Sequence, residues 1–285
     1  MRPLPVPERF PTATLPEPAS SRAGTGSRGS ANRARFLPRL VIACWILRVA
    51  ASSPAAAPIA ALVYSPDGSI LAANGDRALE LRSAADGSVR DRIPCALSKI
   101  GSIVFDPNGS FLVAGGGTPG ESGEVLIFEW PSKKLRQRFS LHADLVTGLA
   151  LSRDAAWLAI TSADHSAELW QTSGNDREFQ VRFRLTGHAG PVLAAAFNSE
   201  GTLLVTVSAD RSLKVWSTET GRLLRTLNYH TEPVHAVVFS PRPARAGADD
   251  SPAACASAGD DRTIRVWQPS IGRMVRIIRP HQGPL

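Results

Sequence analysis

The segment "SADRSLKVWSTETGRLLRTLNYH", residues Ser208–His230, shows most clearly how this chain folds. Apolar and polar residues alternate over 212–215, and this period of two predicts a β-strand. Turn residues follow at 218–221, and an apolar run that begins at Leu223 predicts a second strand. The stretch also contains an aspartate, a tryptophan and a histidine, and these three residue types recur at matching intervals elsewhere in the chain.

Three segments share this spacing. A tryptophan closes a predicted strand in each, and an aspartate stands six residues before it: Asp164 and Trp170, Asp210 and Trp216, Asp261 and Trp267. His142 and His188 each precede their tryptophan by twenty-eight residues. His230 precedes Trp267 by thirty-seven, and an insertion of nine residues at 242–250 accounts for the difference. The pattern indicates a structural unit of about 45 residues that is repeated along the chain.

Two weaker copies of the unit lie upstream. In the first, Asp76 stands six residues before Arg82, and in the second Phe128 takes the place of the tryptophan. Turns of Pro-Asp-Gly at 66–68 and Pro-Asn-Gly at 107–109 separate the first two predicted strands. Four short strands per unit over 59–285 predict an all-β fold, a β-propeller of about five four-stranded antiparallel blades. The expected blades are approximately 59–95, 96–141, 142–187, 188–229 and 230–280.

The repeated units resemble WD repeats. Gly187-His188 matches the Gly-His pair of that family, although each closing tryptophan is followed by Gln or Ser rather than Asp. The resemblance covers about 78% of the chain and is greatest to exported bacterial WD-repeat proteins, some of which are fused to c-type cytochrome domains. This chain contains no haem-attachment motif, so the resemblance does not extend to that chemistry.

The resemblance implies a role for the recurring polar residues. In WD-repeat propellers a His, a Ser or Thr, an Asp and a Trp form a hydrogen-bonded chain inside each blade. The corresponding sets here are His188, Thr206, Asp210 and Trp216; His230, Ser257, Asp261 and Trp267; and His142, Asp164 and Trp170, with Ile160 at the hydroxyl position. A Ser-His-Asp hydrolase needs one exposed nucleophile beside an oxyanion hole. Because the set recurs in successive units, we interpret it as structural and predict no catalytic residue.

Other candidate sites are weaker. The segment "GGGTPGESG", Gly115–Gly123, lacks the Lys-Ser/Thr of a phosphate-binding loop, which favours an inter-strand loop. Asp249-Asp250 and Asp260-Asp261 lack the alternating ligand spacing of a calcium loop. Three isolated cysteines form no metal, redox or haem motif. We therefore predict no cofactor and no metal, and we expect His165 and His235 to be surface or rim residues.

The net charge of +7 is concentrated at the N-terminus. Residues 1–48 contain eight arginines and two acidic residues, a net +6, which leaves about +1 for the rest. The repeat region therefore has no charge pattern for binding nucleic acid. Residues 1–32 are predicted to be a disordered Pro/Arg/Ser-rich leader. Residues 33–58 resemble a signal peptide or a membrane-proximal segment. A cleaved signal, an uncleaved anchor and a non-targeting tail all remain open, and the pattern favours an exported or periplasmic location over a cytoplasmic one.

These observations predict a non-enzymatic scaffold that binds a protein or peptide partner, because a propeller uses its strands for packing and binds at its rims and channel. The alternative is an accessory propeller of an exported redox or hydrolytic system whose catalytic domain lies elsewhere. Five units predict an open or strained arc, either a truncated gene product or a ring that another chain completes. Membrane contact is expected only if the leader is not cleaved.

Overall fold

The computed structural model describes residues 58–173, 178–241 and 253–279. The predicted leader and nearly all of the signal-like segment lie outside these residues. So does the insertion at 242–250, with Asp249 and Asp250.

The described residues form twenty strands in five four-stranded sheets. The first sheet contains β1 (Leu62–Tyr64), β2 (Ile70–Asn74), β3 (Ala78–Ser83) and β4 (Val89–Pro94). The second contains β5 (Lys99–Phe105), β6 (Phe111–Thr118), β7 (Ser122–Glu129) and β8 (Leu135–His142). The third contains β9 (Val146–Leu151), β10 (Trp157–Ser162), β11 (Ala167–Ser173) and β12 (Glu178–Leu185). The fourth contains β13 (Val192–Phe197), β14 (Leu203–Ser208), β15 (Leu213–Ser217) and β16 (Leu223–Leu227). The fifth contains β17 (Val234–Phe239), β18 (Cys255–Gly259), β19 (Ile264–Gln268) and β20 (Arg273–Ile278).

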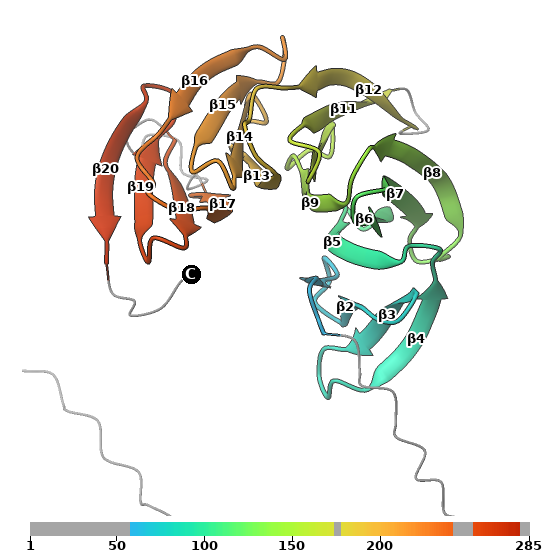
Figure 1. Cartoon of the computed structure of the whole chain (residues 1–285). Helices are drawn as coiled ribbons and strands as arrows, with labels where there is room; N and C mark the ends of the chain where they lie inside the picture. The colour runs from blue at the N-terminus through green and yellow to red at the C-terminus, as the bar shows by residue number, and fades with distance from the viewer. Residues whose placement is uncertain (1–57, 174–177, 242–252, 280–285) are drawn as a thin grey trace, which may run out of the picture. The chain divides into compact units, whose positions relative to one another are not determined.

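Each sheet is an antiparallel meander in which hydrogen-bonded neighbours follow the chain order. Figure 1 shows the sheets in succession, with β5, β9, β13 and β17 on the inner side and the fourth strand of each sheet on the outer side. This is the arrangement of a β-propeller with five blades, and the predicted fold class is confirmed. No helix within the described ranges is long and apolar enough to cross a membrane.

The turn between the first two strands of a sheet needs one residue in the left-handed region. Gly68, Gly109 and Gly201 occupy this position with φ of +71°, +70° and +68°, which glycine adopts without a steric penalty. In the third sheet Ala155 takes the same place with φ of +56°. In the first sheet the Asp67 carboxylate also accepts hydrogen bonds from the hydroxyls of Ser65 and Ser69. The glycines that predicted turns in the sequence are therefore needed for the positive φ of these turns.

The apolar core is divided into four clusters, each lying between two successive sheets. We call the face that a sheet packs against the next sheet in the chain its leading face, and the opposite face its trailing face. Trp267 on the trailing face of the fifth sheet, for example, packs among Val205, Val207 and Val215 on the leading face of the fourth. Each sheet is thus stabilised mainly by its neighbours, as in other repeat proteins.

The five sheets that the structure describes do not close into a ring. Contacts link the first sheet to the second and continue in order to the fifth, and the first and fifth sheets stand at the two ends of the row in Figure 1. This agrees with the predicted incomplete ring of about five blades.

Candidate functional site

The fourth sheet brings together all four of its predicted network residues. His188 Nδ1 lies 2.8 Å from Asp210 Oδ2, and His188 Nε2 lies 2.9 Å from the hydroxyl of Thr206. The indole N–H of Trp216 donates to the same hydroxyl oxygen at 2.9 Å. One proton arrangement satisfies every group: the indole donates to Thr206, Thr206 donates to Nε2, and the Nδ1 proton goes to Asp210. The histidine in this arrangement is neutral.

The protonation states agree with this arrangement. Burial tends to raise the pKa of Asp210, but hydrogen bonds from Ser212, His188 and the Ala189 backbone N–H outweigh it and lower the pKa to about 2. Burial lowers the pKa of His188 below its ordinary value, and the opposing effect of Asp210 is smaller. The pair is therefore an ionised carboxylate with a neutral imidazole, and the ring is held in one tautomer.

The fifth sheet repeats the arrangement after the insertion. His230 Nδ1 lies 2.8 Å from Asp261, its Nε2 lies 2.8 Å from the Ser257 hydroxyl, and Trp267 donates to that hydroxyl at 2.8 Å. The guanidinium of Arg265 adds a 3.1 Å hydrogen bond to Asp261. The pKa of Asp261 is lowered to about 2, because hydrogen bonds from Thr263 and His230 outweigh burial. The insertion therefore leaves the network intact.

The third sheet keeps only half of the network. His142 Nδ1 lies 2.9 Å from Asp164, but Ile160 replaces the hydroxyl, and no described residue bonds to His142 Nε2. Trp170 instead donates its indole N–H to Glu168 at 2.8 Å. Glu168 was not predicted from the sequence. The signal was an acidic residue two positions before the tryptophan, at the position where the fourth and fifth units have Lys214 and Arg265. The indole is satisfied, but the chain that would connect it to the imidazole is broken.

A second kind of residue was also missed. The hydroxyls of Ser166, Ser212 and Thr263 each donate to the aspartate two residues earlier, at 2.6 to 2.7 Å. The signal was an Asp followed two positions later by Ser or Thr in all three units. These hydroxyls help to keep the carboxylates ionised, so each network has more members than the resemblance implied.

The three networks lie in three different sheets and are largely buried. They do not gather around one cleft, and His, Cys, Asp and Glu residues within the described ranges form no group that could hold a metal ion. Cys95 and Cys255 are buried free thiols, and burial raises the pKa of Cys255 to about 12. A thiol held protonated in this way is a poor nucleophile.

The Gly-rich segment is not a loop over most of its length. Residues 115–118 continue β6 and residues 122–123 begin β7. A Cβ atom on Gly116 would lie 1.9 Å from the Lys99 carbonyl oxygen of the neighbouring strand, and only glycine permits this approach. The interpretation as an inter-strand loop is therefore wrong for 115–118 and 122–123. The expected surface positions of the remaining histidines agree with the structure: His165 is exposed, and the partly exposed His235 pairs with Asp260 at 2.9 Å.

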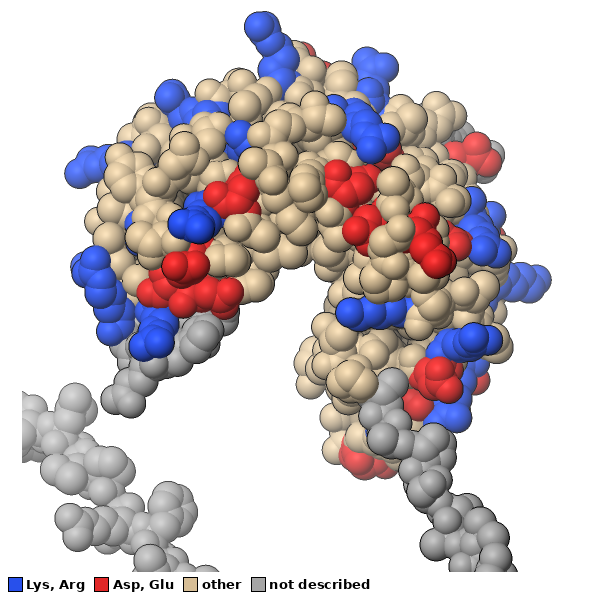
Figure 2. Space-filling model, viewed as in Figure 1, with Lys and Arg blue, Asp and Glu red and all other residues tan. Residues whose placement is uncertain are grey.

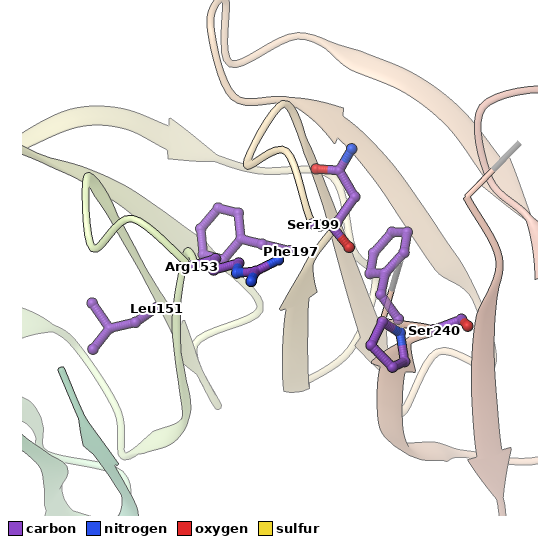
Figure 3. Close-up of a pocket in the computed structure, with 8 residues that line it drawn as sticks. Leu151, Arg153, Phe197, Ser199 and Ser240 are labelled. Atoms are coloured by element: carbon purple, nitrogen blue, oxygen red, sulfur yellow. The ribbon is translucent and has the colours of Figure 1, made fainter. Parts of the chain in front are cut away.

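A pocket of about 370 Å³ lies at the turn that follows the innermost strand of the third, fourth and fifth sheets. Its lining comes from the same short segment of three successive repeats: Leu151, Arg153, Phe197, Asn198, Ser199, Phe239, Ser240 and Pro241. In Figure 3, Arg153 and Phe197 lie between Leu151 and Ser240. We call this the rim pocket. Its apolar side chains are Leu151, Phe197, Phe239 and Pro241, and its one charged side chain is the exposed Arg153.

Charge on the visible face is mixed. In Figure 2 the Lys and Arg side chains lie mostly toward the outer edge, and the Asp and Glu side chains lie nearer the inner edge.

Comparison with known families agrees with this geometry. Residues 133–171, 179–217 and 221–268 match the family described as WD domain, G-beta repeat. The match supports membership of the WD-repeat family. It covers the three sets of network residues described above and also β8 of the second sheet, whereas the first sheet and β5 to β7 share the architecture without a match. No curated protein matches the chain at a significant level.

Proposed function

We propose that this chain is a non-enzymatic WD-repeat scaffold and that it binds a peptide segment of a protein partner in the rim pocket. WD repeats are generally protein-interaction scaffolds, and the family is typically non-catalytic. The His-Asp networks support the proposal because their groups bond to one another inside the sheets, which leaves them a structural role. The rim pocket carries the proposal: three successive repeats contribute one concave surface with partly uncovered apolar side chains.

The chemistry of the rim pocket selects the peptide. Leu151 and Phe197 are partly exposed and can cover an apolar side chain. The guanidinium of Arg153 makes no ion pair with another described residue, so it can donate two parallel hydrogen bonds to a carboxylate. The expected ligand is a peptide in which an apolar side chain neighbours an acidic one.

An array of short peptides tests this proposal. We expect retained peptides to be enriched in apolar residues next to Asp or Glu, and the same peptides with Lys in place of the acid to bind poorly. In fluorescence anisotropy Arg153→Glu should weaken the best peptide about tenfold or more, because a charge-assisted hydrogen bond is lost and a repulsion is created. Arg222→Glu is the matched control, because it makes the same charge change at an exposed turn outside the pocket. Equal weakening by both variants, or no preference for acidic peptides, would contradict the proposal.

The assignment of the leader is part of the proposal. We propose that 59–285 is the propeller domain, that 1–32 is a separate leader, and that 33–58 directs export, as in the exported bacterial WD-repeat proteins that the sequence resembles. Export would put the peptide partner outside the cytoplasm. Mass spectrometry of the protein recovered from a cell-envelope fraction checks this, because cleavage near 55–57 removes a defined mass.

A further inference from the structure

The leading face of the fifth sheet is built like those of the other sheets, but none of the five described sheets packs on it. In the fourth sheet this face consists of Val205, Val207, Leu213 and Val215, all fully buried beneath the fifth sheet. Strand register gives the equivalent residues of the fifth sheet as Ala256, Ala258, Ile264 and Val266, and these are only half-buried. The face is therefore apolar at the same positions and partly open.

The inner and outer strands of the fifth sheet extend this open face. Val238 pairs with Ala256 and is 62% exposed, whereas Ala196 at the equivalent position packs against the core beneath the fifth sheet. Ile278 pairs with Ile264 and is also exposed. A sheet that caps a soluble array normally has a polar outer face, and this face of the fifth sheet is apolar. An apolar face of this extent is typical of an interaction surface.

The other end of the array carries a complementary surface. On the trailing face of the first sheet Leu62 and Tyr64 are exposed, and Tyr64 occupies the position of the buried Phe239. Glu80 lies on this face, and a charged residue at this position is compatible with burial. Its equivalents Glu168, Lys214 and Arg265 are all charged and all buried in the array. The first sheet can therefore be covered in the same way as the later ones.

Charged residues also favour packing of the fifth sheet of one copy on the first sheet of another. Inside the chain Arg225 on the leading face of the fourth sheet donates a 3.0 Å hydrogen bond to the Ser270 carbonyl in the last turn of the fifth sheet. Arg276 is the equivalent of Arg225, and the corresponding turn of the first sheet contains Asp86, whose carboxylate is largely exposed and lies 3.8 Å from the guanidinium of the equally exposed Arg90. A first sheet placed on the fifth would bring Arg276 close to Asp86.

We propose that copies of this chain associate head to tail, the leading face of the fifth sheet packing on the trailing face of the first sheet of a second copy. The contact continues the packing that each sheet already makes inside the chain. A contact of this heterologous kind closes into a ring or extends into a longer oligomer, depending on the rotation between copies. The inference does not depend on the rim pocket.

Light scattering after size exclusion over a micromolar concentration range tests the association. We expect a dimer or longer oligomers whose proportion rises with concentration. Val238→Asp and Tyr64→Asp should each give a monomer, whereas Val181→Asp, the same type of change on the exposed outer strand of the third sheet, should not. Circular dichroism checks that all three variants are folded.

Mixing distinguishes head-to-tail packing from a contact between identical faces. Val238→Asp retains an intact first sheet and Tyr64→Asp retains an intact fifth sheet, so an equimolar mixture should recover a dimer that neither variant forms alone. Arg276→Glu should weaken association, and adding Asp86→Arg should restore it. A monomer at every concentration overturns the proposal. So does a mixture that stays monomeric, or association abolished by Val238→Asp and unaffected by Tyr64→Asp.

Discussion

The third and fourth sheets present the same histidine, aspartate and tryptophan, yet only the fourth forms a complete hydrogen-bonded network. The two networks differ at two buried positions: Thr206 and Lys214 in the fourth sheet correspond to Ile160 and Glu168 in the third. Thr206 accepts from Trp216 and bonds to His188 Nε2. With Ile160 in that place, His142 Nε2 has no hydrogen-bond partner in the described part of the chain, and Trp170 bonds to Glu168.

The comparison indicates which hydrogen bonds of the network the fold requires. Both sheets keep the His-Asp pair, which fixes the loop entering the sheet to the turn between its second and third strands. Both also satisfy the indole N–H, one through a hydroxyl and one through a carboxylate. The hydroxyl link is the dispensable part, because the third sheet buries an apolar side chain there and retains its packing.

The largest effect is expected for Asp210→Ala. The Asp210 carboxylate accepts from His188, from the Ala189 and Ser212 backbone N–H groups and from the Ser212 hydroxyl. Its removal leaves several buried donors unpaired, and we expect the free energy of unfolding to fall by about 3 kcal/mol. Urea denaturation measures it. Asp76→Ala is the control, because Asp76 is exposed at the same turn of the first sheet and should cost almost nothing. Equal losses would contradict a network role for Asp210.

A smaller loss is expected for Thr206→Val, which keeps the shape and removes the hydroxyl. The Trp216 indole N–H and His188 Nε2 then both lack a partner, at a cost of about 2 kcal/mol. Thr231→Val, at an exposed threonine, should be nearly neutral. A loss for Thr206→Val no larger than that of the control would show that the hydroxyl link contributes nothing even where it is present.

Lowering the pH should reduce the stability of the fold in two steps, first through the histidines and then, at lower pH, through the aspartates. The pKa values of His188 and His230 are lowered by burial, so the unfolded chain binds more protons than the folded chain as pH falls through 6.5. Stability is therefore fully present above pH 6.5 and declines below it, by on the order of 1 kcal/mol at pH 5. The lowered carboxylates, with pKa about 2, contribute their own loss only below about pH 4. Urea midpoints that stay flat between pH 7 and pH 5 would contradict this order.

The sequence predicted the repeated elements better than the exceptions to them. Spacing alone placed Asp210, Trp216 and His188 in one unit, because a propeller repeats both its strand lengths and its turns. The Glu168 acceptor was missed because the choice of a partner for a buried indole depends on side-chain geometry in the third sheet. The rim pocket was missed for a different reason: it exists only where the same turn from three sheets comes together, and no single repeat contains it. The segment around Gly116 was predicted to be a loop but belongs to strand β6. Its glycine allows the Lys99 carbonyl of the neighbouring strand to come close, and amino-acid composition does not reveal such a contact.

The smallest change in the free energy of unfolding is expected when the third sheet receives the hydroxyl that the fourth sheet has. Ile160→Thr removes buried apolar atoms but places a hydroxyl where His142 Nε2 lacks a partner, so the two effects should largely cancel, to a net loss of about 1 kcal/mol or less. Ile127→Thr, at an equally buried isoleucine of the second sheet without such a histidine, should cost about 2 kcal/mol or more. A nitrogen NMR shift of His142 Nε2 should report the new hydrogen bond. If Ile160→Thr costs as much as Ile127→Thr and that signal does not move, the hydroxyl position is not what separates the two sheets.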